Sequence, residues 1–307
     1  MSLVVVGTMA FDAIETPFGK SDKIVGGAAT YIAWSASNFT NSVKQISVVG
    51  GDFPKKELKL LEARGVILDG VEIKEKEKSF FWSGRYHLDM NTRDTLDTQL
   101  NVLANFTPVV PELYQDCEFL MLGNLVPALQ LSVIEQLKNR PKLVVLDTMN
   151  FWMETAMGDL EKVLKKVDVL LINDSEARQL SGQYSLVAAA KTILEMGPKY
   201  LVIKKGEHGA LLFHEEKVFF APALPLEMVF DPTGAGDTFA GGFIGYLAKT
   251  KDISFENMKS AIIVGSALAS FCVEKFGTTR LKELSKADID DRIQQFKELT
   301  KFEIELE

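Results

Sequence analysis

The run from Asp231 to Phe243, D-P-T-G-A-G-D-T-F-A-G-G-F, holds the residue types and spacing best suited to chemistry. Its small residues allow backbone N–H groups to turn inward just before a helical pattern at 238–249: Gly234, Ala235 and Gly236. Inward N–H groups and the positive end of a helix dipole favour a phosphoryl group or developing negative charge. Asp237 follows at the opening of the helix, where its carboxylate can accept a proton from an attacking hydroxyl. An acidic cap on a buried, glycine-rich helix is the alternative interpretation.

Several other enzyme classes lack their diagnostic residues in this chain. Gly19-Lys20-Ser21 resembles the end of a P-loop, but that motif needs a glycine at position 14, where the chain has Ile14. The third glycine of a dinucleotide-binding turn and the G-x-S-x-G elbow of an α/β-hydrolase are both missing. Two cysteines and three histidines without metal-type spacing exclude a disulfide scaffold and disfavour a zinc hydrolase.

The elements that must position this turn follow an alternating strand and helix pattern. Short, continuous apolar runs predict strands buried on both faces, at 3–6, 46–49, 119–122, 143–146, 169–172, 201–203 and 210–213. Helical periodicity separates most of them, at 54–64, 128–139, 154–166 and 185–196. The alternation predicts a three-layer α/β/α sandwich with a mostly parallel sheet, whose ligands bind beyond the carboxyl ends of the strands.

Two segments interrupt this alternation, at 11–23 and roughly 66–103. Both are rich in charged and β-forming residues and lack long helical patterns. We expect them to form a small β-sheet that projects from a single domain spanning 1–307 and acts as a lid. A surface hairpin without a role in binding is the alternative.

The composition bounds the location and the partners of the protein. The 307 residues carry 34 basic and 42 acidic side chains, a net charge of −8, which argues against a general nucleic-acid binder. The N-terminus lacks the pattern of a signal peptide, and no run of 18 apolar residues predicts a membrane span. We therefore expect a soluble, cytoplasmic protein with a small-molecule substrate.

The run at 231–243 resembles the C-terminal signature of the PfkB, or ribokinase-like, carbohydrate kinases. Other stretches resemble family motifs in the same order: Gly26-Gly27-Ala28-Ala29-Thr30-Tyr31-Ile32-Ala33 the N-terminal signature, Gly50-Gly51-Asp52 with Gly65-Val66 the V-G-x-D…G-V stretch, Asn173-Asp174-Ser175-Glu176 the N-x-x-E motif, and Lys205-Gly206-Glu207-His208-Gly209 the nucleotide-side K-x-G-x-x-G turn, one residue shorter. The resemblance covers nearly all of residues 3–300.

The resemblance implies ATP-dependent phosphorylation of a hydroxymethyl group on a sugar. Asp237 would be the base, and the turn at 234–236 would hold the transferred phosphoryl charge. The implied nucleotide-binding residues are Asn173, Glu176, Lys205, Gly206, Gly209 and Gly265, with Glu176 ordering Mg²⁺ through water. Considered without the family, Asn173 and Glu176 also fit a helix capping box, and Gly206 and Gly209 also fit a hairpin turn.

On the acceptor side, the resemblance implies that Asp12 accepts hydrogen bonds from sugar hydroxyls and that Gly26 and Gly27 bring backbone N–H groups to the sugar. Asp52 is a further candidate, and a helix cap before Pro54 is its alternative role. The family's usual asparagine is Tyr31 here, which weakens an assignment as ribokinase proper. In the lid, Arg85 heads a charged set that could bind an anionic acceptor or form a solvated hairpin tip. The rest of that set is His87, Asn91, Arg93 and Asp94.

Many members of the family also bind a monovalent cation, and Asp231 and Thr233 match part of that loop, so K⁺ is a further candidate cofactor. An exposed edge of the lid could pair with a second copy to give a homodimer. Two alternatives to a sugar kinase remain open, a nucleoside kinase and a catalytically silent, sugar-sensing binding protein on the same fold.

Overall fold

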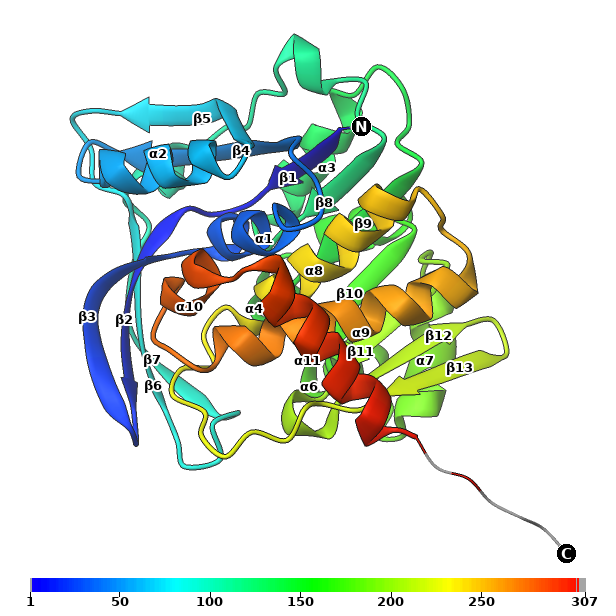
Figure 1. Cartoon of the computed structure of the whole chain (residues 1–307). Coiled ribbons are helices and arrows are strands. Elements are labelled where there is room, and N and C mark those ends of the chain that lie inside the picture. The colour runs from blue at the N-terminus through cyan, green and yellow to red at the C-terminus, as the bar shows by residue number, and fades with distance from the viewer. Residues whose placement is uncertain (1, 302, 304–307) are drawn as a thin grey trace, which may run out of the picture.

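The computed structural model describes residues 2–301 and 303, in which two sheets lie side by side (Figure 1). The larger sheet has nine strands in the order β13-β12-β11-β10-β9-β8-β1-β4-β5. Seven strands are parallel, and β12 and β13 are antiparallel additions at one edge. The strand bounds are β1 (Leu3–Val6), β4 (Val43–Gly50), β5 (Val66–Lys74), β8 (Phe119–Leu122), β9 (Leu143–Asp147), β10 (Val169–Asn173), β11 (Tyr200–Lys204), β12 (Ala210–His214) and β13 (Lys217–Ala221).

Helices cover both faces of this sheet because neighbouring residues of each central strand point into different apolar cores. In β1, Leu3 and Val5 belong to one core and Val4 and Val6 to the other. The first core is covered by α1 (Ala28–Ala36), α2 (Lys55–Ala63), α8 (Ala235–Thr250), α9 (Phe255–Cys272), α10 (Thr279–Glu283) and α11 (Lys286–Leu299). The second is covered by α3 (Pro127–Glu135), α4 (Asn150–Thr155), α5 (Met157–Leu164), α6 (Asp174–Ser181) and α7 (Leu186–Glu195). The predicted α/β/α sandwich is confirmed.

The small sheet has the order β3-β2-β6-β7 and consists of β2 (Ala10–Thr16), β3 (Gly19–Gly26), β6 (Phe80–Tyr86) and β7 (Arg93–Gln99). The segment 66–74, which the sequence analysis assigned to the lid, is instead β5 and pairs in parallel with β4 at the edge of the large sheet. Three short 3₁₀ helices complete the described elements, η1 (Asn101–Asn105), η2 (Glu112–Tyr114) and η3 (Gly206–His208).

The two faces of the small sheet have different neighbours. Asp12 of β2 pairs with Trp82 of β6, and Phe11 pairs with Phe81. Because side chains alternate along a strand, Asp12 and Trp82 share one face and Phe11 and Phe81 share the other. The first face points toward the N-terminus of α8, since the hydroxyl of Thr233 donates to the Tyr86 hydroxyl at 3.2 Å.

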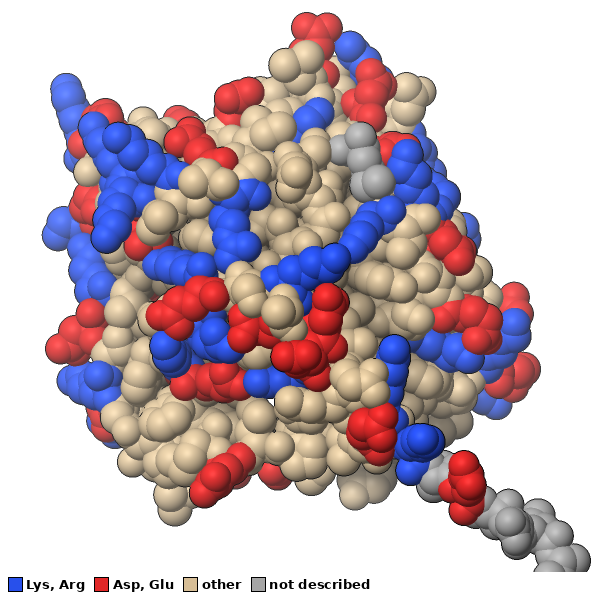
Figure 2. Space-filling model, viewed as in Figure 1, with Lys and Arg blue, Asp and Glu red and all other residues tan. Residues whose placement is uncertain are grey.

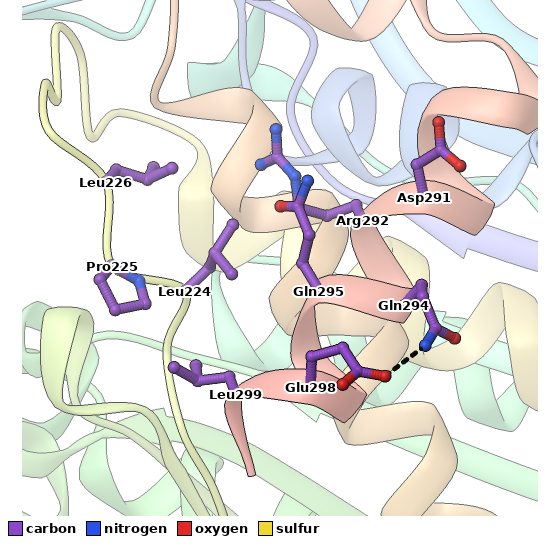
Figure 3. Close-up of a pocket in the computed structure, with 9 residues that line it drawn as sticks. All are labelled: Leu224, Pro225, Leu226, Asp291, Arg292, Gln294, Gln295, Glu298 and Leu299. Atoms are coloured by element: carbon purple, nitrogen blue, oxygen red, sulfur yellow. Dashed lines mark hydrogen bonds between the residues drawn. The ribbon is translucent and has the colours of Figure 1, made fainter. Parts of the chain in front are cut away.

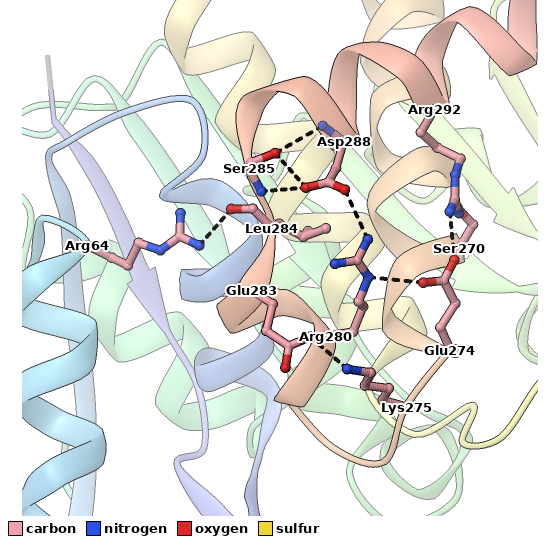
Figure 4. Close-up of polar contacts among 10 residues, drawn as sticks. All are labelled: Arg64, Ser270, Glu274, Lys275, Arg280, Glu283, Leu284, Ser285, Asp288 and Arg292. Atoms are coloured by element: carbon pink, nitrogen blue, oxygen red, sulfur yellow. Dashed lines mark hydrogen bonds and ion pairs between the residues drawn. The ribbon is translucent and has the colours of Figure 1, made fainter.

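The C-terminal helices are fastened by a network of charged groups (Figure 4). Arg280 donates to Glu274 and Asp288 at 3.1 and 3.2 Å, and Arg292 donates to Glu274 at 2.6 Å. In Figure 2, acidic and basic side chains are interspersed on this face rather than collected into one field. Among the described residues, none of the helices combines the length and the apolar character that crossing a membrane requires.

Candidate active site

Three strands of the large sheet end in polar residues that meet beside the first turn of α8. Asp147 ends β9, Asn173 ends β10 and Lys204 ends β11. Parallel strands bring their carboxyl ends to one edge, where the Lys204 ammonium lies 2.8 Å from the Asp147 carboxylate. We call Asp147, Glu176, Lys204 and Asp237 the charged cluster.

The turn before α8 has the backbone that the sequence predicted. Gly234 is the N-cap residue in a left-handed conformation with φ 75°, and a Cβ there would lie 2.4 Å from the Tyr31 ring. Only glycine fits both requirements. The helix begins at Ala235, three residues earlier than predicted, so Asp237 lies in its first turn. No side chain caps this end of the helix. The Ala235 N–H donates to the Pro232 carbonyl oxygen at 3.2 Å, and the N–H groups of Gly236 and Asp237 in the first turn remain available to an anion.

The carboxyl group of Asp237 has a pKa that suits a general base. Burial, and then the neighbouring charge of Asp147, raise the pKa of Asp237 to about 7, while Lys204 and Arg93 oppose the shift. A carboxyl group with a pKa near neutrality can take a proton and release it again at physiological pH.

We call residues 234–236 the phosphate turn, after the role expected of it. The lysine beside this turn is Lys204, whereas the sequence analysis selected Lys205. The Lys204 side chain is 17% exposed, and its Nζ lies 3.1 Å from the position of a Cβ on Gly236. Lys204 is the last residue of β11, and Lys205 follows it as the N-cap residue of η3. Counting the K-x-G-x-x-G motif from Lys204 removes the missing residue, and this count could have identified the correct lysine from the sequence.

Asn173 and Glu176 form a capping box at the N-terminus of α6. The side-chain oxygen Asn173 Oδ1 accepts from the Glu176 N–H at 2.8 Å, and Glu176 Oε2 accepts from the Asn173 N–H at 2.8 Å. The capping alternative is therefore confirmed. Burial raises the pKa of Glu176 to about 7, and its uncapped oxygen still faces the charged cluster. Within residues 2–301 and 303, no group of three or more acidic, histidine or cysteine side chains is arranged to hold a metal.

Asp12 lies across the site from the cluster, against the end of β3. A Cβ on Gly26 would lie 1.8 Å from the Asp12 Oδ2, so the carboxylate fills the space that glycine leaves. Burial and the charges of Asp231 and Asp237 raise the pKa of Asp12 to about 7, although the Gly27 N–H opposes the shift. Asp12, Gly26 and Gly27 therefore lie together, as the resemblance implied for the acceptor side.

Tyr31 packs its ring against Gly234, and its buried hydroxyl has no hydrogen-bond partner within the described part of the chain. Burial, Asp12 and Asp231 raise the pKa of that hydroxyl, so it stays protonated and able to donate. An unpaired buried donor beside Asp12 is a position where a bound hydroxyl could be recognised.

The small sheet contributes Arg93, which the sequence analysis placed in the lid set, and Trp82 and Tyr86, which it did not select. Arg93 pairs with Tyr86 across β6 and β7, and its guanidinium lies 5.7 Å from the centre of the Trp82 ring. Arg93 shares the face of Tyr86, whose hydroxyl contacts Thr233 beside α8, and its positive charge opposes the rise in the pKa values of Asp12, Glu176 and Asp237. The alternation of β6 could have identified Trp82 and Tyr86 once Asp12 was placed opposite them.

The structure does not bring Arg85 or Asp52 to this site. Arg85 lies on the other face of β6 from Tyr86 and pairs with Glu15 at 2.8 Å. Asp52 accepts from the Ser79 N–H and hydroxyl at 2.7 and 2.8 Å and pairs with Lys23. It lines a cavity of about 220 Å³ on the Phe11 side of the small sheet, away from Asp12.

The predicted nucleotide glycines have separate positions. Gly206 and Gly209 form the turn between β11 and β12, and a Cβ on Gly206 would lie 2.5 Å from the Asn91 amide oxygen. The tip of the small sheet therefore rests on this turn. Gly265 is buried where α8 and α9 cross, because a Cβ there would lie 2.8 Å from the Phe239 carbonyl oxygen. It is a packing residue and not part of the charged cluster.

The loop predicted to hold a monovalent cation is fastened by Asp231. One carboxylate oxygen accepts from the Thr233 N–H at 2.9 Å and the other from the Gly277 N–H at 2.8 Å. Asp231 is fully buried and joins the phosphate turn to the segment after α9.

A groove of about 540 Å³ lies apart from this chemistry, between α11 and the segment 224–226 (Figure 3). Leu224, Leu226 and Leu299 form its apolar side, and Arg292 is turned into the network under α11. None of the charged cluster lines it.

Comparison with known proteins agrees with this arrangement. A family model described as pfkB family carbohydrate kinase matches residues 2–284. The cytidine kinase of Thermococcus kodakarensis is 32% identical over 254 residues, which cover 80% of this chain and 88% of that protein. Two solved structures share the fold. A Burkholderia thailandensis nucleoside kinase in complex with inosine has a TM-score of 0.77 and 20% identity, and the match covers 95% of this chain and 98% of that chain. A putative ribokinase II from E. coli in complex with ATP and Mg²⁺ has a TM-score of 0.77 and 18% identity, and the match covers 96% of this chain and 99% of that chain. With the phosphate turn, its acid and the two sheets in place, the chain belongs to the pfkB family of carbohydrate kinases and is a phosphotransferase that acts on an alcohol group.

Proposed function

We propose that the protein transfers the γ-phosphoryl group of ATP to the hydroxymethyl group of a nucleoside. The observation that carries the proposal is the position of Asp237, between the phosphate turn of α8 and the Asp12 face of the small sheet. A nucleoside bound at Asp12 would present its hydroxymethyl group to Asp237, and the triphosphate would end at the turn.

The roles of the residues follow from this placement. Asp237 takes the proton of the hydroxyl as its oxygen bonds to the γ-phosphorus, while the bond from that phosphorus to ADP breaks. The N–H groups of Gly234 and Gly236 stabilise the charge on the transferred group, and the Ala235 N–H joins them by leaving the Pro232 carbonyl oxygen. Asp12 accepts hydrogen bonds from the ribose hydroxyls, and the Tyr31 hydroxyl is a donor for the same sugar.

Mg²⁺ is the expected cofactor, and the residues present fit it. The uncapped oxygen of Glu176 is free for a water of the ion's shell, and Mg²⁺ in kinases uses few carboxylates together with substrate phosphates. When bound, the ion offsets the charge of the triphosphate. Glu176 and Asn173 otherwise keep their capping bonds.

Trp82 supports a nucleoside over a free sugar. Its half-buried indole lies on the same face of the small sheet as Asp12, with which it pairs across the strands. A flat aromatic ring beside the sugar position offers a base a surface for stacking, and a free sugar has no aromatic base to stack on it. The names of the relatives, a cytidine kinase and a nucleoside kinase holding inosine, support the same choice.

The test is acceptor-dependent release of ADP with a panel of nucleosides, ribose, fructose and sugar phosphates. We expect nucleosides to have kcat/KM at least tenfold above every free sugar. Preference for a free sugar would reject the nucleoside and keep the kinase. Binding of a sugar without any turnover would instead favour a silent sensor, although such a protein has no need to keep Asp237.

Three finer expectations remain proposals. The K⁺ site at Asp231 and Thr233 would have to use backbone carbonyl groups, because both carboxylate oxygens of Asp231 already accept N–H groups. The homodimer would use an open edge of the small sheet, at β3 or β7. The cytoplasm is the expected compartment of an ATP-dependent enzyme of this composition.

A further inference from the structure

Two strands of the small sheet end on the segment 230–233, which leads into the phosphate turn. The hydroxyl of Thr16, the last residue of β2, donates to the Phe230 carbonyl oxygen at 3.0 Å. Tyr86 is the last residue of β6, and its hydroxyl accepts from the Thr233 hydroxyl at 3.2 Å. Both side chains are buried. Their strands pair in parallel up to the preceding residue of each, so the two hydroxyl contacts are adjacent.

The segment 230–233 is fastened on its other side by the chain that follows α9. The Phe230 N–H donates to the Val273 carbonyl oxygen at 2.8 Å. The Asp231 carboxylate accepts from the Thr233 and Gly277 N–H groups at 2.9 and 2.8 Å. The two hydroxyl contacts therefore add a link to the small sheet, whereas the main support of the segment comes from the large sheet's side. Because the segment ends directly before the phosphate turn, its position sets where the N–H groups of the turn lie.

The strand that holds the Phe230 carbonyl group also carries the proposed acceptor site. Asp12 lies four residues before Thr16 in β2, so the alternation of side chains puts both on one face of the small sheet. Ile14 lies between them on that face and is fully buried. A nucleoside bound at Asp12 would thus contact the same strand, and the same face of it, that ends on the segment 230–233.

We propose that Thr16 and Tyr86 are positioning residues that couple the acceptor site to the phosphate turn. An acceptor that fixes the small sheet would also fix the segment 230–233, and with it the N–H groups that receive the transferred phosphoryl group. The inference rests on the proposed kinase activity but is independent of which acceptor is used.

Coupling of this kind would protect ATP from transfer to water when no acceptor is bound. In that side reaction a water oxygen bonds to the γ-phosphorus as the bond from that phosphorus to ADP breaks, and a proton of the water goes to Asp237. A turn that is complete only with the acceptor in place makes this reaction slower than transfer to the acceptor.

The test removes each hydroxyl while keeping the shape of the side chain, in Thr16→Val and Tyr86→Phe. One neutral hydrogen bond changes an equilibrium by about threefold to tenfold, and we expect each variant to lower kcat/KM for the best nucleoside of the panel by that factor. The double variant should lose about tenfold or more, with ATP hydrolysis in the absence of acceptor within about twofold of wild type. Tyr114→Phe is the matched control, because it removes a hydroxyl that donates to the Ile67 carbonyl oxygen at 3.2 Å, outside the small sheet.

A binding measurement separates coupling from catalysis. Coupling between two sites is reciprocal, so the nucleoside should tighten the affinity of the wild type for the ATP analogue AMP-PNP with Mg²⁺ by about fivefold or more in calorimetric titration. In Thr16→Val/Tyr86→Phe the nucleoside should change that affinity by less than about twofold, while the affinity for AMP-PNP alone stays near the wild-type value. A merely structural role would weaken both affinities together. Each single variant gives the same comparison if the double variant does not fold.

The outcomes distinguish this proposal from the proposed function. An active wild type whose nucleoside leaves the AMP-PNP affinity unchanged would overturn the coupling and keep the kinase. Variants that retain the wild-type kcat/KM and the wild-type effect of the nucleoside would do the same, as would an equal loss in Tyr114→Phe. A wild type that phosphorylates no acceptor would overturn the proposed function itself.

Discussion

Asp237 has two interpretations that one substitution separates. Asp237→Asn keeps the size of the side chain, but it cannot take a proton at neutral pH. We expect kcat to fall by about 10²–10⁴-fold with ATP affinity kept or improved, because a carboxylate next to the triphosphate is removed. Steady-state kinetics measure kcat, and calorimetric titration measures the affinity for ATP. Turnover within threefold of wild type would remove Asp237 from the mechanism and leave it a charge at the positive end of the helix dipole.

The three carboxyl groups with raised pKa values predict a specific pH dependence. Asp12, Glu176 and Asp237 have pKa values of about 7 in the folded chain, above those of an unfolded chain. The folded state therefore holds more protons between about pH 4 and 7, and the free energy of unfolding contributed by these groups falls as the pH rises through that window. Activity should move the opposite way, because Asp237 acts as a base only when it is unprotonated.

Melting temperatures and pH–rate profiles test this pair of trends. kcat/KM should rise with pH to a plateau above about 7. Asp237→Asn should melt above wild type at pH 8, and its advantage should shrink toward pH 4.5, because protonation removes the same charge from the wild type. An advantage that is equal at both pH values would contradict burial as the cause.

The sequence predicted those parts of the site in which a motif determines the backbone conformation. It predicted less well those in which contacts between distant residues determine which side chain enters the site. The phosphate turn at 234–236 followed from residue type, since only glycine leaves the space that position 234 needs. The resemblance placed Asp12 and Gly26 on the same side of the site, but their direct contact is seen only in the structure. The structure places Lys204 in the charged cluster, whereas the sequence analysis selected Lys205, because contacts and not composition decide which of two adjacent lysines enters a site. Asp147 was missed because a lone acid at the end of a strand has no motif of its own.

At the scale of elements, the small sheet separates two arginines by the face they occupy. Arg93 faces the charged cluster, and Arg85 pairs with Glu15 on the opposite face. If the triphosphate or the acceptor contacts the guanidinium group of Arg93, Arg93→Ala should raise the KM of that substrate by about tenfold or more, because a charged hydrogen bond is lost. Arg85→Ala is the matched control and should change neither KM by more than threefold. Equal effects of the two variants would reject the assignment of faces.

The crossing of α8 and α9 gives a prediction about stability. Gly265→Ala would force a Cβ to within 2.8 Å of the Phe239 carbonyl oxygen, and we expect a loss of about 1–3 kcal/mol from overpacking. Gly158→Ala is the control, because no atom lies within 4 Å of its Cβ position in α5 and alanine favours a helix. Urea unfolding should show the first variant less stable and the second equal or more stable than wild type. Equal stability of both variants would contradict the tight crossing.

The elements were predictable where apolar runs are continuous. All seven predicted strands of the large sheet exist, because their side chains are buried on both faces. β5 and β13 were missed for one reason, since both are edge strands with charged or exposed residues that resemble a loop. The small sheet was expected from the loss of helical periodicity, but its pairing depends on contacts between distant segments.

At the scale of the whole molecule, a residue in the N-terminal part of the chain contacts the backbone near the C-terminal helices. Arg64, just after α2, donates to the carbonyl oxygens of Lys282 and Leu284 at 3.1 Å each (Figure 4). The family model ends at residue 284, so α11 lies beyond the matched part and is held by the arginine network under it. This arrangement could not be derived from the sequence, where α11 is only an alternation of charges.

The contact between Asn91 and the turn at Gly206 has a consequence for the speed of turnover. The hairpin that carries Tyr86 and Arg93 also reaches the turn between β11 and β12 through Asn91. If the acceptor binds under the hairpin and the nucleotide binds at that turn, as we propose, one opening motion of the hairpin would uncover both products. When that motion limits kcat, the rate should fall in proportion to solvent viscosity, as measured with added sucrose, and Asn91→Ala should weaken that dependence.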